Sequence, residues 1–175
     1  RLDPEPLAML SKTLTNAIDQ CRAAIFHLAG EEFNLNSPQQ LGTILFEKLK
    51  IDPHARRTRK TGQFQTSEQT LRRLAMSHEI AQQVLSYRES TKLKSTYVDM
   101  LPGTVDERTG HVHTTYEQAV TATGRLQSSG PNLQNIPVRS EFGREIRKAF
   151  VPRSEEYLLL SADYSQIELR LAAEI

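Results

Sequence analysis

Residues 157–170 read YLLLSADYSQIELR, a stretch in which an apolar run leads directly to a carboxylate, Asp163. A second carboxylate, Glu168, follows five residues later. The pattern predicts a strand over 157–162 and a helix after it. A carboxylate at the carboxyl end of a strand is a common position for a metal-binding or catalytic group. Ser165 and Glu168 also fit a capping box, so an ordinary helix start explains the pair equally well.

The part of the chain before residue 100 has the three- and four-residue apolar spacing of amphipathic helices. The first helix is predicted to begin at Asp3, which a proline follows, and to end at Gly30. A second, shorter helix is predicted after Ser37. A third is predicted from a capping box at Thr66 to about Lys94. We therefore expect the first part of the chain to be all helical.

The pattern changes after residues 102–103, which are Pro-Gly. Residues 104–118 alternate β-branched and polar side chains around a turn at 107–110, which predicts a β-hairpin. Residues 130–137 have the composition of a loop, and a short helix is predicted near 141–149. The chain is thus assigned to the α+β class, with a helical part followed by a mixed part.

Composition narrows the class of protein but not its function. The chain has 22 Lys and Arg against 21 Asp and Glu, so a surface that binds polyanions must come from local clustering. Hydrophobic residues make up 38% and charged residues 25%, as in soluble globular proteins, and no apolar run is long enough to cross a membrane. A single cysteine, Cys21, excludes an internal disulfide framework and a zinc site of several cysteines. We expect it at a buried apolar position, in a reducing, cytoplasmic compartment.

A basic cluster lies in residues 54–62, between two predicted helices: Arg56, Arg57, Arg59 and Lys60. Cations at the tip of a loop can neutralise nucleic-acid phosphates, which adds affinity that falls with salt but carries no sequence information. The alternative is a solvated run of charge without a ligand.

Amide and guanidinium side chains are concentrated in residues 122–139, which contain Arg125, Gln127, Asn132, Gln134, Asn135 and Arg139. Every base pair presents acceptors in the minor groove, so Asn, Gln and Arg donors can contact DNA there whatever its sequence. Small neighbouring residues would let the backbone approach the duplex. The alternative is a polar loop whose amides satisfy its own turns.

Two histidines, His111 and His113, alternate on the predicted hairpin and so would share one face. Two ligands without a third nearby seldom make a metal site. We interpret them as strand residues, with surface or phosphate contacts as the alternative.

Read in order, these features resemble family A DNA polymerases, the bacterial DNA polymerase I type. The matching stretches span nearly the whole chain: FNLNSPQQLGTILFEKL (33–49), TKLKSTY (91–97), TATGRL (121–126), PNLQNIPVR (131–139) and DYSQIELR (163–170). The resemblance implies a right-hand polymerase architecture that is incomplete here. Residues 1–32 would be a long helix that packs on the palm, 33–100 the helical thumb with a basic tip at 54–62, and 101–175 the first part of an antiparallel-sheet palm.

The resemblance also implies roles for the two carboxylates. Asp163 corresponds to one of two aspartates that hold a pair of Mg²⁺ ions, and the carbonyl of Tyr164 would be a further ligand. Glu168 corresponds to the side chain that excludes a ribose 2′-hydroxyl. The nucleotide-binding segment would be Tyr164, Ser165, Gln166, Ile167 and Glu168.

The DNA-binding residues implied by the resemblance extend the basic tip and the amide-rich segment. They are Arg56, Arg57, Arg59, Lys60, Lys92, Lys94, Ser95, Thr96, Arg125, Asn132, Gln134, Asn135 and Arg139. The implied partners are primer–template DNA, deoxynucleoside triphosphates, and the remainder of a polymerase chain with its fingers, the rest of the palm and exonuclease domains.

The function implied is templated DNA synthesis in the bacterial cytoplasm, close to the nucleoid. Since the fingers helix and the second metal aspartate are not among these 175 residues, we expect the fragment alone to be inactive. A non-catalytic module that binds duplex nucleic acid is the alternative. A single-subunit RNA polymerase is a third possibility, and Glu168 speaks against it because such an enzyme must admit the 2′-hydroxyl.

Overall fold

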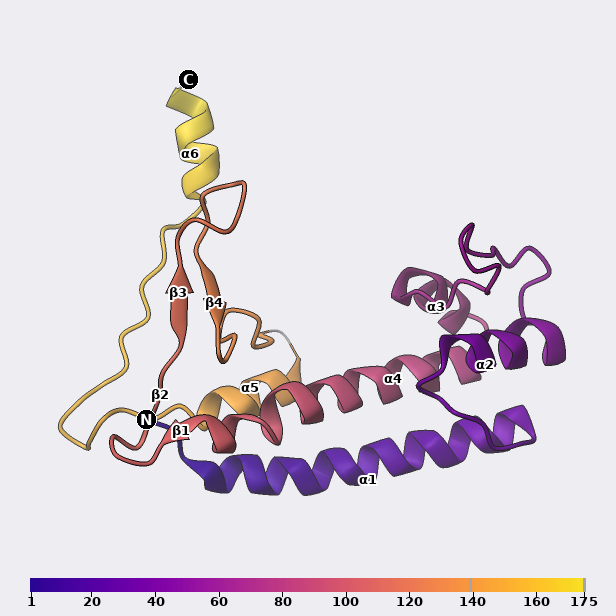
Figure 1. Ribbon diagram of the computed structural model, residues 1–175, viewed down its shortest axis with the longest axis horizontal. Helices are drawn as coiled ribbons and strands as arrows, with labels where there is room; N and C mark the ends of the chain where they lie inside the picture. The colour runs from indigo at the N-terminus through magenta and orange to yellow at the C-terminus, as the bar shows by residue number, and fades with distance from the viewer. Residues whose placement is uncertain (139, 175) are drawn as a thin grey trace.

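The computed structural model describes residues 1–138 and 140–174, and these residues form an elongated molecule with an arm at one end (Figure 1). Its helices are α1 (Pro4–Ala29), α2 (Pro38–Gly42), α3 (Glu68–Ala75), α4 (Glu79–Leu93), α5 (Glu141–Lys148) and α6 (Ile167–Glu174). Its strands are β1 (Val105–Asp106), β2 (His111–Val112), β3 (Thr115–Glu117) and β4 (Gln127–Ser129). Two π-helical turns, η1 (Thr43–Lys48) and η2 (Lys94–Val98), and a 3-10 turn, η3 (Leu101–Thr104), complete the regular structure. The predicted α+β class is confirmed.

Helix α1 begins and ends where the sequence predicts. The side chain of Asp3 accepts a hydrogen bond from the backbone N–H of Glu5 at 3.1 Å, and proline fills the first helical position. Gly30 ends the helix in the left-handed conformation, with φ 74°, and its N–H donates to the carbonyls of Phe26 and His27. The cap residues therefore set both ends of the longest helix.

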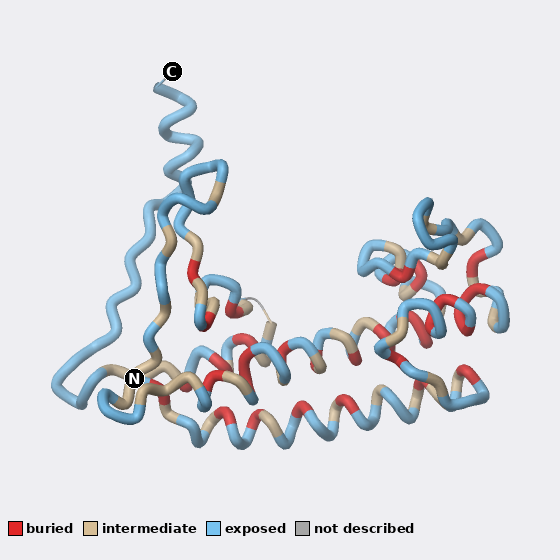
Figure 2. The backbone as a smooth tube through the Cα atoms, in the orientation of Figure 1, coloured by how far each residue is buried: buried red, intermediate tan, exposed pale blue. Residues whose placement is uncertain are grey.

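Helices α1 and α4 lie side by side and antiparallel, and they carry two separate apolar cores (Figures 1 and 2). The distal core, at the end of the pair that carries α2 and α3, gathers buried residues of α1, α2, η1, α3 and α4 and of the α1–α2 connection: Ile18, Ile25, Ala29, Leu35, Leu41, Ile44, Leu45, Phe46, Leu71, Leu74, Ile80, Ala81, Val84 and Tyr87. The proximal core gathers Leu2, Leu7, Leu10, Leu14, Leu93, Tyr97, Val98, Leu101, Ile136, Ile146 and Ala149. Half-buried Cys21 packs against the distal core, and burial raises its pKa.

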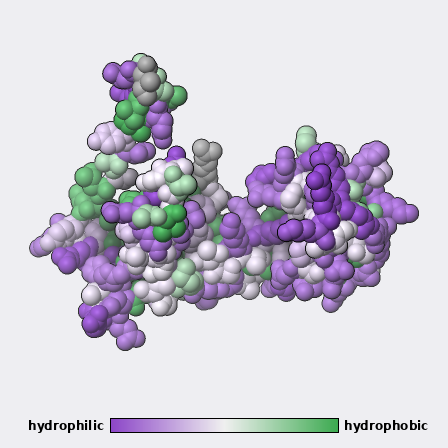
Figure 3. Space-filling view, turned by 45° about the horizontal axis from the view of Figure 1, so that its top comes forward, coloured by the Kyte–Doolittle hydropathy of each residue, from purple (hydrophilic) through white to green (hydrophobic). Residues whose placement is uncertain are grey.

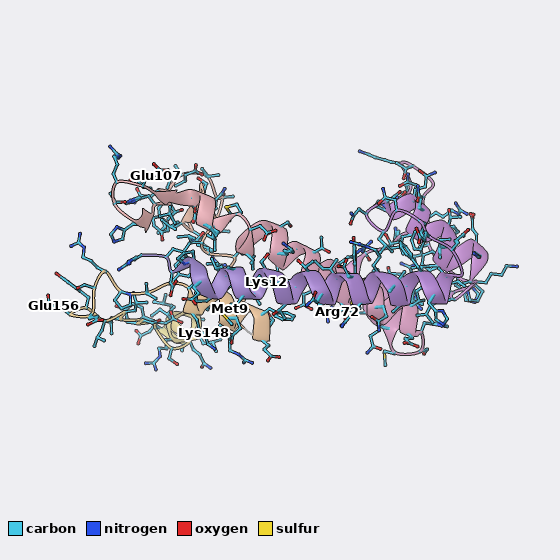
Figure 4. The ribbon with its side chains drawn as sticks, turned by 90° about the horizontal axis from the view of Figure 1, so that it is seen from below. Met9, Lys12, Arg72, Glu107, Lys148 and Glu156 are labelled. Carbon is cyan, nitrogen blue, oxygen red and sulfur yellow. The ribbon has the colours of Figure 1, made fainter. Side chains whose placement is uncertain are left out.

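The exposed side of α1 turns away from α4. In Figure 4, which is seen from below, α1 lies in front, and Met9 and Lys12 lie on its exposed face. The apolar side chains of α1 that are buried face α4 instead, so the helix has the amphipathic division that its sequence predicts.

The single third helix predicted from Thr66 to about Lys94 is wrong. The chain forms α3 and α4, separated at residues 76–78, and Ser67 rather than Thr66 caps α3 by accepting from the N–H of Thr70. Leu71 and Leu74 are buried because α3 folds back against α4, which one continuous helix could not achieve. Beyond α4 the backbone continues into the π-helical turn η2.

The predicted hairpin is confirmed over its first part. Val105 pairs with Val112 and Asp106 with His111 around the turn at 107–110. The last part of the predicted hairpin does not belong to it. Residues 115–117 form β3, which pairs antiparallel with β4 in a second two-stranded sheet. The helix predicted near 141–149 is confirmed as α5.

The strand predicted over 157–162 is wrong. The residues are extended but have no strand partner among the described residues, and helix α6 begins only at Ile167. A strand needs a neighbour for its backbone hydrogen bonds, and local apolar pattern cannot supply one. Leu158 and Leu160 are each 92% exposed, and Figure 3 shows hydrophobic side chains, in green, over this part of the molecule.

No helix of the described residues is long and apolar enough to span a bilayer.

The exposed apolar side chains of the segment 157–171 should make the chain associate with itself. They are Tyr157, Leu158, Leu159, Leu160, Tyr164, Ile167, Leu169 and Leu171. We expect sedimentation velocity to show concentration-dependent oligomers of the 175-residue chain, and the Leu158→Lys/Leu160→Lys variant to be monomeric. Met76→Lys, at a side chain 87% exposed on the other end of the molecule, is the control that should still associate. A wild-type chain that stays monomeric at all concentrations would contradict this expectation.

Candidate nucleic-acid interface

The basic loop between η1 and α3 is a small ordered structure rather than a free tip. Arg57 and Phe64 form an isolated antiparallel bridge, and the N–H of Thr58 donates to the carbonyl of Gln63 at 2.7 Å. The guanidinium of Arg57 lies 3.8 Å from the centre of the Phe64 ring. Arg57 also donates to the carbonyl of Gly62 at 2.9 Å and pairs with Glu47 at 3.0 Å. Its charge is therefore used to hold the loop together.

The other three cations of the loop, Arg56, Arg59 and Lys60, are exposed. Arg56 lines a cavity of about 500 Å³ together with Arg73 of α3, which the sequence analysis did not select. Arg73 could have been found from the sequence, because the consecutive pair Arg72-Arg73 lies in a predicted helix that follows the basic loop. Such a helix can add positive charge to that of the loop. The structure thus brings a further cation to the site.

Buried Asp52 fixes Arg73. The carboxylate accepts from Arg73 Nη2 at 2.5 Å and from the N–H of His54 at 3.0 Å, and it is only 8% exposed. The hydrogen bond from Arg73, and then that from His54, lowers the pKa of Asp52 below its ordinary value. Asp52 therefore stays ionised and holds Arg73 at the edge of the cavity.

The four residues selected near the end of α4 divide into two groups. Lys94 is only 23% exposed, and its ammonium donates to Asp99 at 2.7 Å and to the hydroxyl of Ser11 in α1 at 2.9 Å. Ser95 donates back to the carbonyl of Thr91. Lys92, Ser95 and Thr96 are exposed, although the Ser95 hydroxyl is already used by the Thr91 carbonyl. Lys94 joins η2 to α1, whereas the side chains of Lys92 and Thr96 are exposed and form no such internal bond within the described residues.

The amide-rich loop 130–137 uses two of its side chains internally. The side-chain oxygen of Asn132 accepts from the N–H groups of Gln134 and Asn135, at 3.0 and 3.3 Å. The Gln134 amide accepts from the N–H of Ser128 at 2.9 Å and donates to the carbonyl of Leu126 at 3.1 Å. For Asn132 and Gln134 the structure therefore agrees with the alternative interpretation, in which the amides of a polar loop satisfy backbone groups of the protein itself.

The base of the loop is packed against the rest of the molecule. Ile136 lies in the proximal core, and the phenol of Tyr97 donates to the carbonyl of Asn135 at 2.5 Å. Gly143 of α5 approaches Pro137 so closely that an added Cβ would lie 2.5 Å from the Pro137 carbonyl oxygen. Only glycine allows α5 to sit this close to the loop.

Arg125 and Asn135 keep exposed side chains next to this fixed loop. The backbone carbonyl of Arg125 accepts from the hydroxyl of Thr121 at 2.7 Å, which closes the turn between β3 and β4. Gln127 is a strand residue paired with Glu117. Arg139 lies outside the described residues.

The carboxylates Asp163 and Glu168 are both exposed. Between them Gln166 has a left-handed backbone with φ 51°, which is uncommon for a residue other than glycine, and Arg170 donates from Nε to the carbonyl of Ser165 at 3.1 Å. Within the described residues no three His, Cys, Asp or Glu side chains are grouped to hold a metal. The carboxylate of Asp163 and the adjacent carbonyl of Tyr164 are hard oxygen donors of the kind Mg²⁺ prefers, so they fit part of a magnesium site.

His111 and His113 lie together at the β1–β2 hairpin, with ring centres 6.2 Å apart. His113 Nε2 is 2.8 Å from the hydroxyl of Thr109, and both histidines line a cavity of about 560 Å³ with Arg153. The interpretation of both as strand residues is confirmed for His111, which lies in β2, and is wrong for His113, which follows the end of that strand.

Comparison with known proteins shows what this arrangement is similar to. A family model described as DNA polymerase family A matches residues 4–175. DNA polymerase I of Synechocystis sp. is 51% identical over 175 residues, 100% of this chain and 18% of the relative, and that of Geobacillus stearothermophilus is 50% identical, with 100% and 20% covered. A solved structure of the POL domain of Pol1 from M. smegmatis, in complex with DNA primer-template and dNTP, has a TM-score of 0.84 and 39% identity, covering 99% of this chain and 30% of that one. The chain spans about a fifth of the length of these curated relatives.

Two arginines of the basic loop should respond differently to substitution. We expect Arg57→Ala to lower the free energy of unfolding by about 1 kcal/mol, because it removes the Phe64 and Glu47 contacts, while Arg59→Ala leaves stability unchanged. Arg59→Ala should instead weaken duplex DNA binding and reduce the slope of log Kd against log salt by about 1. Urea unfolding and fluorescence anisotropy measure the two effects. Equal stability of both variants would show that Arg57 does not hold the loop.

Asp52 should make stability depend on pH. Because its pKa is lowered in the folded state, its contribution is present above the ordinary carboxyl pKa and is lost as the pH falls through the lower value. We expect the free energy of unfolding to fall below about pH 4. Asp52→Asn should cost about 1–2 kcal/mol at pH 7 and flatten this fall, as measured by urea unfolding. Asp19→Asn, at an exposed pair with Arg22, is the control that should change neither quantity.

Proposed function

Because the chain belongs to DNA polymerase family A, we propose that it is the part of a DNA-directed DNA polymerase that grips primer–template duplex and supplies one active-site carboxylate. The observation that carries the proposal is the family match over residues 4–175, at about 50% identity to bacterial DNA polymerase I along the whole chain. We also propose that the polymerase works in the cytoplasm and that its substrates are deoxynucleoside triphosphates.

Duplex binding would use side chains whose charges and donors are open to a ligand. At the distal end these are the exposed cations of the basic loop, with Arg73 beside them. Along α4 and η2 they are Lys92 and Thr96, and at the β3–β4 end Arg125 and Asn135. The two ends lie at opposite ends of the α1–α4 pair (Figure 1), an arrangement suited to contacting separate parts of one duplex. The division into a thumb at 33–100 and a palm from 101 is part of this proposal.

The chemistry would begin with Asp163 and Tyr164. Their carboxylate and carbonyl oxygens would hold Mg²⁺, which when bound supplies charge stabilisation for phosphoryl transfer and activates the primer hydroxyl. Glu168, five residues later, would occupy the space that a ribose 2′-hydroxyl requires. Residues 164–168 would form the floor of the nucleotide site. The exposure of all these side chains leaves them open to a substrate.

A single carboxylate is not enough for two metal ions in a phosphoryl-transfer site. We therefore propose that the second aspartate and the groups that bind the triphosphate come from other parts of a polymerase. The alternative function is a non-catalytic module that binds duplex nucleic acid. It is favoured by the spread of the candidate binding side chains along the chain and by the fact that, among the described residues, no three His, Cys, Asp or Glu side chains are grouped to hold a metal.

The isolated chain should bind duplex without extending it. We expect weak primer–template binding whose Kd rises steeply between 50 and 200 mM salt, because it depends on phosphate contacts. No nucleotide should be added in a primer-extension assay. Template-directed incorporation by the 175-residue chain would contradict the proposed division of the site, and salt-independent affinity would contradict the proposed interface.

A chimera separates the enzyme from the binding module. Residues 1–175 can replace the corresponding segment of DNA polymerase I from Geobacillus stearothermophilus, to which they are 50% identical. We expect the chimera to extend primers and Asp163→Asn to reduce the rate by about 1,000-fold, equivalent to about 4 kcal/mol, with duplex binding retained. Asp19→Asn is the matched control. A chimera that binds primer–template but does not extend it, with or without Asp163, would favour the binding module.

A further inference from the structure

A buried cluster of hydroxyl groups lies directly beneath the amide-rich loop. Ser128 of β4 is only 1% exposed, and its hydroxyl accepts from the N–H of Leu133 at 3.0 Å. The Ser128 hydroxyl lies 2.8 Å from the Thr114 hydroxyl. The Thr114 hydroxyl also lies 2.8 Å from the carbonyl oxygen of Pro131. The loop is therefore tied to β4 by several partly buried hydrogen bonds that meet at the buried Ser128 hydroxyl.

The side chain of Gln134 adds a second connection between loop and strand. Its amide bonds the carbonyl of Leu126 and the N–H of Ser128, which are two residues apart in the chain. Backbone groups of alternate residues face the same edge of a strand. The Gln134 amide thus bonds the N–H of Ser128 on one edge of β4 and the carbonyl of Leu126 just before the strand, while β3 pairs with the other edge.

These contacts leave Arg125 between two fixed points. Its own carbonyl accepts from the Thr121 hydroxyl at 2.7 Å, and the carbonyl of the next residue, Leu126, accepts from Gln134 at 3.1 Å. The guanidinium is exposed, and it forms no ion pair with any of the described residues. An exposed donor on an already ordered backbone loses less conformational entropy when it binds.

We propose that Gln134 is a positioning residue that acts on nucleic acid through Arg125 and not by its own contact. The reason is that both ends of its amide already have partners in the protein, whereas the Arg125 side chain has none that is charged. This inference rests on the proposed function, because it assigns the origin of affinity within the proposed duplex interface. It also changes the role of Gln134 from the direct minor-groove contact that the sequence predicts.

A double-mutant cycle tests the proposal. The Kd of the 175-residue chain for a primer–template duplex is measured by fluorescence anisotropy for Gln134→Leu, Arg125→Ala and the double variant. Gln134→Leu keeps a side chain of similar size but loses both hydrogen bonds. We expect Gln134→Leu and Arg125→Ala each to raise the Kd about fivefold. The double variant should have the same Kd as Arg125→Ala, because Gln134 would act only through Arg125. Gln20→Leu, on the exposed side of α1, is the control that should bind like the wild type.

Losses that multiply in the double variant would overturn the proposal, since Gln134 would then contact the duplex independently. Wild-type affinity of Gln134→Leu would overturn it as well. Amide hydrogen exchange gives a second measurement that needs no DNA: in Gln134→Leu, the N–H of Ser128, which donates to the Gln134 amide oxygen, should exchange faster, while the N–H groups of α1 stay unchanged. If the wild-type chain binds no duplex, the proposed function fails; unchanged exchange at Ser128 would then separately disprove the positioning role.

Discussion

The antiparallel contact between α1 and α4 is the constraint on which the other elements depend (Figures 1 and 2). Both helices contribute side chains to the distal and the proximal core, so neither core forms without them. With 26 residues, α1 is about 39 Å long, and this length separates the basic loop from the β3–β4 sheet. The separation of the two candidate DNA-contacting regions is therefore set by helix length and by the register of one helix pair.

Sequence reasoning succeeded where a structure depends on neighbours in the chain. The caps of α1, the turn before β2 and the short helix α5 each need only residues within a few positions, and each could be predicted. It failed where the outcome depends on distant partners. The break after α3 follows from packing on α4, and the extended residues 157–162 have no strand beside them among the residues described, so apolar pattern alone could not decide either.

The same limit explains why the candidate site was predicted only in outline. The position of the basic loop and of the amide-rich loop could be found from composition, but not which side chains remain open. Arg57 is paired with Glu47. Lys94 is paired with Asp99 and also donates a hydrogen bond to Ser11, a residue 83 positions away. Gln134 is similarly used by the backbone of β4. Counting charges and amides cannot distinguish a group that binds the protein itself from one that faces solvent.

The hydrogen bond from Tyr97 to the carbonyl of Asn135 connects η2, the continuation of α4, with the loop that would face the duplex. Tyr97 is 4% exposed, and burial raises the pKa of its phenol, so the donor remains protonated at neutral pH. At its other end α4 packs against α3, the helix that follows the basic loop. One continuous helical element therefore runs between the two regions that would face DNA, so their relative placement depends on a single rigid connection rather than on a flexible linker.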